Sequence, residues 1–384
     1  MALAAKGFRP FFLLAAAFAV AILPLWMLTL VGILNPTFYL DAVSWHAHEM
    51  VFGFAVAVIA GFLLTAVGNW TKRETAVGVP LLALSAVWLL GRIAITGAPL
   101  FLHWFTAVAD LAFLPVLIVV LARPLIASKN HRNLVMLGLL GALFLANLAI
   151  HLDVLGVLPG WRRRGNFFAI DLVILVILLM AGRVFPMFTR NATDVASIRA
   201  LPALDLATVV AMGTLALLDA FAAPPMVAGV AAGVTGILAA ARSVHWGARH
   251  VFKLPLVWIL HVGYAWIPLG LVLRGLSAFG SAVPSSVATH ALTVGGIGAL
   301  TLGMMSRVAL GHTGRALTVS PPVVASFVLV TLAAMVRVLI PLVSPASYRP
   351  SLFVAGSLWT AAFGIYLVVH APMLVMARPD GKVG

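Results

Sequence analysis

Residues 45–50 of the chain read WHAHEM, and they stand directly before the apolar run VFGFAVAVIAGFLLTAV. Neutral imidazole is a common protein ligand for iron, copper and zinc. On a helix, residues two apart differ by about 200° in direction, so His46 and His48 face nearly opposite sides and cannot easily chelate one ion. Glu49 follows His46 by three residues and shares its face. The segment therefore predicts ligands for two centres, or for one centre and one structural contact.

Other ionisable residues stand at a similar depth in neighbouring apolar runs. A rise of about 1.5 Å per residue places the WHAHEM histidines and Glu49 within roughly 10 Å of one boundary of the apolar layer. At that depth stand also His103, His151, Asp171 and His290, with His261 nearer the middle. Ionisable residues inside membrane spans are rare and usually face the interior of the bundle.

A single histidine in a helical bundle more often bonds to a neighbouring polar group than to a metal. We apply that interpretation to each of His103, His151, His245, His250 and His370 taken alone. His46, His48 and His290 taken together favour a metal site. The segments GRVFPMFTRNAT and SRVALGHTGR place polar residues where helices are expected to end. They are either capped helix ends or a site for an anion or for proton entry, with His312 as the titrating group.

The composition indicates a polytopic all-α membrane protein. Of the 384 residues, 63% are hydrophobic and only 9% are charged, where a soluble protein would carry about a quarter. The net charge of +14 fits Lys and Arg gathered in loops on one face of a membrane, so we expect no nucleic-acid partner. The chain has no cysteine, which excludes disulfides, iron–sulfur clusters and covalently attached haem.

Twelve apolar runs are long enough to cross a bilayer, for which roughly 20 residues suffice. The first, Phe11 to Leu34, is too long for a signal peptide, and we expect it to be retained. We expect one transmembrane helical domain over 1–384, with both termini in the cytoplasm because most Lys and Arg then lie inside. The spans are expected near 10–34, 44–68, 77–97, 101–122, 133–152, 166–188, 200–221, 226–245, 253–277, 284–309, 319–343 and 348–375.

Two features qualify this layout. Thr71, Thr193 and Thr313 end the second, sixth and tenth spans at intervals of 122 and 120 residues, which either reflects three repeats of four helices or is a chance similarity of short loops. The segment GWRRRGN places Arg162, Arg163 and Arg164 on the outer side, against the charge rule. It is either a solvated loop at the lipid headgroups or a clamp for an anionic group near the outer surface, such as a carboxylate or phosphate. The propionates of a haem would be one such group.

Several blocks of the chain, in order, resemble the NnrS family of bacterial inner-membrane proteins. They are KGFRPFF, WHAHEM, GFLLTAVGNW, GRVFPMFTRNAT, LHVGYAWIPLG, THALTVGGIG and MSRVALGHTGR. The resemblance implies a multi-span protein of the bacterial inner membrane that contains haem b and copper and acts in nitric oxide metabolism and defence against nitrosative stress. The resemblance implies functional roles for the matching positions, which are His46, His48, Glu49, His261, His290, His312 and Arg315, and further His151 and Arg183. It does not assign a metal to each residue.

Three functions remain open from the sequence. The first is a haem and copper protein that binds nitric oxide or reduces it, with an electron donor that the sequence does not identify. In it His46 or His48, with His261 and His290, would ligate metal, and Glu49 would orient a ligand or relay protons. The second is a proton-coupled transporter that uses Glu49, Asp171 and the buried histidines. The third is a sensor or metal-handling scaffold without turnover.

Overall fold

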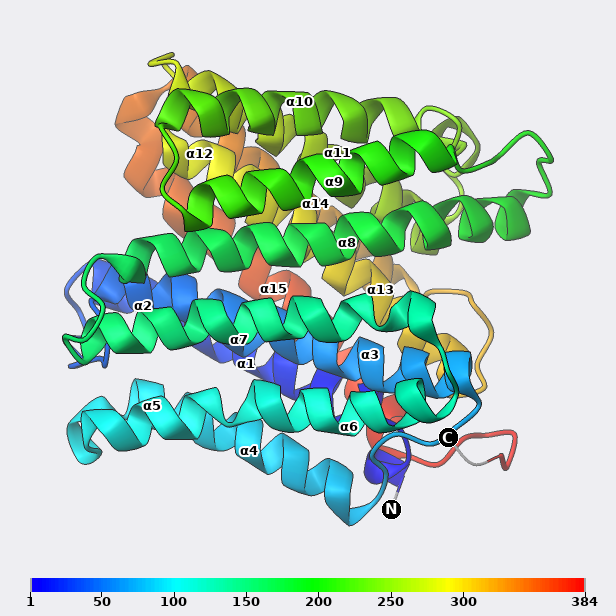
Figure 1. Ribbon diagram of the computed structural model, residues 1–384. Helices are drawn as coiled ribbons and strands as arrows, with labels where there is room; N and C mark the ends of the chain where they lie inside the picture. Colours follow the sequence, from blue (N-terminus) through cyan, green and yellow to red (C-terminus); the bar gives the residue numbers. More distant parts are fainter. Residues whose placement is uncertain (1, 383–384) are drawn as a thin grey trace. The chain divides into compact units, whose positions relative to one another are not determined.

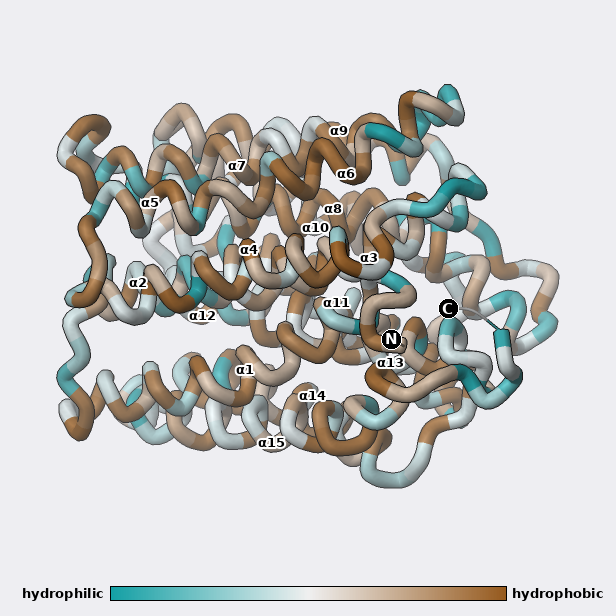
Figure 2. Tube along the Cα trace, turned by 90° about the horizontal axis from the view of Figure 1, so that it is seen from below, coloured by the Kyte–Doolittle hydropathy of each residue, from teal (hydrophilic) through white to brown (hydrophobic). Residues whose placement is uncertain are grey.

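The fold consists of helices with no strand among residues 2–382, which a computed structural model of the chain describes. Twelve of its helical segments are long and apolar enough to cross a membrane. The predicted class is therefore confirmed, and each predicted span coincides with one of these segments. Figure 2 shows hydrophobic residues along the helices and hydrophilic residues concentrated in the connections. Which side of the membrane holds the termini stays a prediction.

Contacts group the helices into two compact units. Unit 1 comprises residues 1–169, 308–316 and 366–384, and unit 2 comprises 170–307 and 317–365. Each unit therefore contains segments that lie far apart in the sequence. The prediction of one domain over the whole chain stays a prediction.

Unit 1 is built mainly from the first seven α-helices (Figure 1). The second span is continuous but changes its winding: α2 gives way to a π-helical segment, η2, before α3 begins. Helix α1 packs against η2 and α3, and α6 packs against α3 and α7. The bounds are α1 Phe8–Leu30, α2 Ala42–His48, η2 Glu49–Ala55, α3 Val56–Thr71, α4 Val79–Thr96, α5 His103–Leu111, α6 Phe113–Ala127 and α7 Val135–Val154.

Unit 2 begins within the long helix α8 (Figure 1). Here α10 packs against α9 and α11, and a second π-helical segment, η6, packs against α11 and α14. Helices α8, α13 and α15 pass from one unit to the other. The bounds are α8 Trp161–Thr193, α9 Pro202–Ala220, α10 Pro225–Ser243, α11 Pro255–Ala278, α12 Ser285–His290, η6 Ala291–Gly298, α13 Ala299–His312, α14 Pro321–Val343 and α15 Tyr348–Val375.

Local sequence explains where several helices begin. Proline stands in the first turn of α4, α9, α10, α11 and α14, where its missing N–H leaves no hydrogen bond unmade. Asp41 caps α2 by accepting a hydrogen bond from the Ser44 amide at 3.0 Å. One start differs from expectation: the arginines of GWRRRGN lie in the first turns of α8 and not in a loop.

Short 3₁₀ turns join several of these helices. They span Ala2–Ala4, Ala98–Leu100, His131–Asn133, Ala248–His250 and Pro345–Ser347. The start of α1 meets the end of α15 within unit 1, since Nη1 of Arg9 donates to the carbonyl oxygens of Leu374 at 2.9 Å and Met376 at 2.7 Å. The two ends of the chain's helical part therefore lie on the same side of unit 1.

Candidate metal centre

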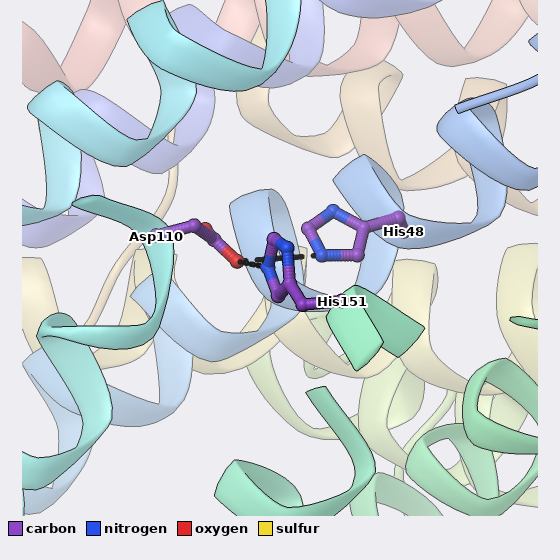
Figure 3. Close-up of side chains that lie close together, drawn as sticks. All are labelled: His48, Asp110 and His151. Atoms are coloured by element: carbon purple, nitrogen blue, oxygen red, sulfur yellow. Dashed lines mark hydrogen bonds and ion pairs between the residues drawn. The ribbon is translucent and has the colours of Figure 1, made fainter. Parts of the chain in front are cut away.

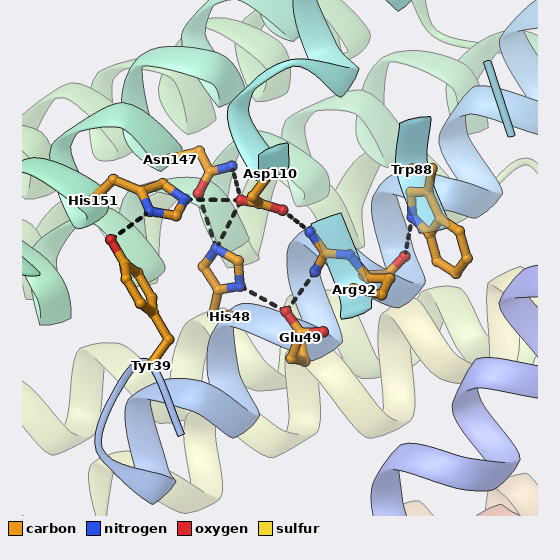
Figure 4. Close-up of polar contacts among 9 residues, drawn as sticks. Tyr39, His48, Glu49, Trp88, Arg92, Asp110, Asn147 and His151 are labelled. Carbon is orange, nitrogen blue, oxygen red and sulfur yellow. Dashed lines mark hydrogen bonds and ion pairs between the residues drawn. The ribbon is translucent and has the colours of Figure 1, made fainter. Parts of the chain in front are cut away.

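A cluster of polar side chains is buried in unit 1 among α2, η2, α4, α5 and α7 (Figure 4). His48 is its centre and is fully buried. Its Nδ1 lies 2.9 Å from Oε1 of Glu49, and its Nε2 lies 2.9 Å from Oδ1 of Asn147 and 3.4 Å from Oδ2 of Asp110.

Both ring nitrogens of His48 therefore face hydrogen-bond acceptors. The amide of Asn147 is held in this orientation because its Nδ2 donates to Oδ2 of Asp110 at 2.7 Å. A neutral imidazole has only one N–H to donate. Both acceptors are therefore satisfied if His48 carries protons on both nitrogens, or if a cation takes the place of one proton.

The charges of the cluster favour a cation as well. Arg92 pairs with both carboxylates: Nη1 lies 2.5 Å from Oε1 of Glu49, and Nη2 contacts Oδ1 of Asp110. Glu49 is fully buried, and its Oε2 has no hydrogen-bond partner. Two carboxylates against one guanidinium leave one negative charge in a region of low dielectric, where uncompensated charge is strongly unfavourable.

Gly91 allows this close approach of α4 to α5. A Cβ atom at this position would lie 3.0 Å from Cα of Asp110 and 3.1 Å from its Oδ1. Any side chain at position 91 would therefore push Asp110 away from Arg92.

His151 of α7 completes the cluster. Its Nε2 lies 2.9 Å from Oδ2 of Asp110, and its Nδ1 lies 3.2 Å from the hydroxyl of Tyr39. Tyr39 lies in the loop before α2, and burial raises its pKa to about 12 although Arg162 opposes the shift. The phenol therefore keeps its proton at neutral pH and is available to hydrogen-bond to His151.

His48, Asp110 and His151 come from three different helices and form a group that could hold a metal ion (Figure 3). One ligand atom of each lies within 4.8 Å of the others. Ligands at about 2.0–2.2 Å from a tetrahedral ion lie roughly 3.4 Å apart, so small shifts would suffice to enclose one. Two imidazoles and one carboxylate suit copper, zinc or ferrous iron.

The predicted site residues of unit 1 are only partly brought together. The structure unites His48, Glu49 and His151, whereas the ring of His46 stacks on Trp26 of α1 at 4.1 Å. The two WHAHEM histidines thus contact different helices, as their spacing predicts. His312 packs against Phe8 at 5.7 Å.

Phe8 and Trp26 are 18 residues apart on α1, or about 27 Å along its axis. His312 and His46 therefore lie near opposite ends of that helix.

The three arginines at the start of α8 have different surroundings. Arg162 pairs with Asp153 at 2.9 Å and with Asp41 at 3.4 Å. Arg163 lies over the ring of Phe167 at 5.5 Å, and Arg164 is exposed. Arg162 already serves two carboxylates of the chain, and the cofactor role predicted for the three stays a prediction.

Two further predicted ligands belong to unit 2. Nε2 of His261 lies 2.9 Å from the hydroxyl of Thr189, whose proton goes to the carbonyl of Phe185. His261 therefore donates through Nε2. Nδ1 of His290 lies 2.6 Å from the carbonyl of Ser286, which places the proton of the neutral ring on Nδ1.

Sequence reasoning missed four partners of the site: Tyr39, Arg92, Asp110 and Asn147. Arg92 and Asp110 could have been found from the sequence, since each is a charged residue inside an apolar run.

His370 of α15 was expected to make a structural contact. Its Nδ1 lies 3.2 Å from the carbonyl of Tyr366, and its buried Nε2 has no hydrogen-bond partner. That arrangement leaves a lone pair on Nε2.

A family model described as NnrS protein matches residues 2–378, nearly the whole chain. No curated protein matches the chain.

Proposed function

Since the chain belongs to the NnrS family, as its sequence blocks predict, we propose that it is a metal-containing protein of the bacterial inner membrane that binds or reduces nitric oxide. It would act in denitrification or in defence against nitrosative stress. The observation that carries the proposal is the buried group His48, Asp110 and His151 in unit 1.

Copper fits this group. Imidazole nitrogens with a carboxylate oxygen are suitable donors for it. Asn147 and Arg92 hold Asp110 from the other side, and Glu49 orients His48 through Nδ1. Such outer contacts fix the direction of a ligand's lone pair and tune its basicity.

Haem b fits a different kind of histidine. A histidine that would hold haem iron needs one nitrogen with a free lone pair and a hydrogen bond through the other, and His370 would meet this need with its unpartnered Nε2 and its Nδ1 on a backbone carbonyl. His290 has the same proton placement on Nδ1. When bound, haem iron supplies a site for nitric oxide wherever a coordination position is open.

Glu49 keeps the role of an orienting or proton-relaying residue in this proposal. Its Oε1 is engaged by His48 and Arg92, while its buried Oε2 has no partner. Reduction of two nitric oxide molecules to nitrous oxide and water takes up two electrons and two protons. The electrons would come from a donor protein or quinol, and the protons from buried acids of this kind.

The test is metal analysis with a reduced-minus-oxidised visible spectrum on purified protein. We expect copper to be lost in His48→Ala and His151→Ala and kept in His131→Ala, whose histidine is exposed. Haem should be lost in His370→Ala and not in the copper-site variants. A wild type free of both metals would refute the proposal.

Measuring nitric oxide consumption after its addition to the purified protein distinguishes an enzyme from a sensor. A reductase consumes it repeatedly with dithionite or a quinol, whereas a sensor or scaffold binds it once.

A proton-coupled transporter is the second candidate, and one observation in unit 2 favours it. Arg274 pairs with Asp171 at 2.8 Å and also with Asp219, so two carboxylates share one guanidinium. Asp171 is fully buried, and its Oδ2 has no partner. Buried acids in membrane helices often carry protons for transport. Proton flux into proteoliposomes that is lost in Asp171→Asn would support this function.

A further inference from the structure

Arg337 of α14 is a buried cation without a carboxylate partner. The residue is 3% exposed, and its Nε and Nη1 are buried without hydrogen-bond partners. Its Nη2 donates to the hydroxyl of Tyr348 at 3.0 Å. The guanidinium also lies over the ring of Tyr348, 4.8 Å from its centroid. A buried charge is strongly unfavourable unless it is paired.

The other fully buried arginines of the described chain have acceptors. Arg92 has two carboxylates, and Arg242 contacts Asp205 and donates to the carbonyl of Leu178. Arg9 donates to carbonyls at the end of α15. Arg337 is therefore the exception, and the difference needs a physical reason.

The surroundings of Arg337 in unit 2 repeat part of the architecture of the metal centre in unit 1. The same interval of 242 residues separates Thr71 from Thr313 and His48 from His290. In each unit a π-helical segment begins directly after the histidine. In each unit, too, the helix that carries the arginine packs against that segment: α4 against η2, and α14 against η6. Such π-helical segments are frequent at functional sites.

The two sites differ at the residue that follows the histidine. In unit 1 it is Glu49, whose carboxylate neutralises Arg92. In unit 2 it is Ala291, which is buried in an apolar cluster together with Ala334 and Val338 of α14. The chain thus supplies the anion in unit 1 and omits it in unit 2.

The remaining carboxylates of unit 2 do not serve Arg337. Asp171 and Asp219 pair with Arg274, and Asp205 pairs with Arg242. Asp194 is exposed at the end of α8.

We propose that Arg337 and Tyr348 bind an oxyanion, a phosphate or carboxylate group that comes from outside the chain. Guanidinium groups bind such groups through two parallel hydrogen bonds, and the phenol supplies the opposite side of the site.

The depth of the site agrees with this ligand. Arg337 stands six residues before the end of α14, or about 9 Å, and Tyr348 begins the next helix. Arg349 beside it is exposed and adds positive charge at the surface. The oxyanion can therefore be the phosphate of an anionic lipid headgroup or a small free ion, and the experiment distinguishes them.

The test compares wild type with Arg337→Gln and with Arg349→Gln as the matched control for charge. Delipidated protein in neutral detergent receives phosphatidylglycerol, sodium phosphate, or phosphatidylcholine with sodium chloride at equal ionic strength. Tryptophan fluorescence then gives the midpoint of thermal unfolding. We expect either phosphatidylglycerol or phosphate to raise the midpoint by about 5 °C in wild type and in Arg349→Gln, and not in Arg337→Gln.

A shift with phosphatidylglycerol alone identifies a lipid headgroup, and a shift with phosphate identifies a free oxyanion. The absence of a shift in wild type, or an equal shift in Arg337→Gln, overturns the proposal. If Arg337→Gln does not fold, Arg337→Lys replaces it, because it keeps the charge and loses the bidentate contact. Retention of an anionic adduct by wild type and its loss from Arg337→Lys in native mass spectrometry would then support the site, and retention by both would overturn it.

Discussion

Nε2 of His48 lies 2.9 Å from the side-chain oxygen of Asn147, although the two residues are 99 positions apart. Asn147 in turn donates to Asp110, so its amide cannot rotate without losing that bond. This contact bears on the chemistry of the site, because it turns an acceptor toward the nitrogen that would bind the metal, and an acceptor facing this nitrogen favours a proton or a metal cation there.

Replacement of Arg92 by Gln should destabilise unit 1 strongly. The variant leaves Glu49 and Asp110 buried without their cation, and removal of one partner from a buried ion pair typically costs about 3–5 kcal/mol. Thermal unfolding in detergent measures the effect, with exposed Arg164→Gln as the control. Recovery of part of the loss in Arg92→Gln combined with Glu49→Gln would show that charge is the cause.

His46→Phe should keep the metal that His48→Phe loses. A phenylalanine can still stack on Trp26, and the candidate metal ligands are His48, Asp110 and His151. Metal content per chain measures the difference. Equal loss of metal from both variants would mean that His46 is itself a ligand.

Tyr39→Phe should weaken metal binding by about 10–100-fold, as is usual for the loss of an outer hydrogen bond to a ligand. A ring that gives Nε2 to a metal carries its proton on Nδ1, and Nδ1 of His151 faces the Tyr39 hydroxyl. Competition with a chelator of known affinity measures the change. His103→Gln is the control, since its exposed ring also touches Tyr39 but is not one of the candidate metal ligands.

The start of α2 should loosen in acid. Burial raises the pKa of Asp41, but hydrogen bonds from Ser44 and the charge of Arg162 outweigh it, and the pKa lies below its ordinary value of 3.8. The carboxylate therefore stabilises α2 above that pH, and the contribution disappears as the pH falls through the lower pKa of the folded state.

Amide exchange at Ser44 should accordingly be faster, after correction for intrinsic rates, at a pH well below the ordinary pKa of 3.8 than at pH 6. Asp41→Asn keeps a capping oxygen and should abolish this dependence on pH. A dependence that persists in the variant would assign it to another group.

Arg9→Gln should release the end of α15 from α1. Nη1 of Arg9 donates to the carbonyls of Met373, Leu374 and Met376 at the end of α15, and the last carbonyls of a helix have no partner within that helix. Limited proteolysis should then cut the chain after residue 370 faster than in wild type, while Lys6→Gln, which removes an exposed ion pair with Glu74, should not change the rate.

The sequence alone determined the class of the protein and the position of its helices. Each apolar run is long enough to cross a bilayer, and within lipid a helix is the conformation that satisfies its own backbone. The histidines and Glu49 of WHAHEM stood out for a related reason, because polar side chains at that depth need partners. The division of His46 and His48 between two faces followed from helix geometry.

The tertiary structure decided which partners those residues have. Asp110 contacts Asn147 and His151 across 37 and 41 positions, and the choice depends on which helices are neighbours, which periodicity does not encode. A π-helical segment also begins at Glu49, and the side chain of Glu49 contacts His48 and Arg92. Burial then supplied the argument for the proposed metal: at low dielectric, a cluster of acceptors around one imidazole favours a bound proton or metal cation, and only packing could show that these side chains are buried.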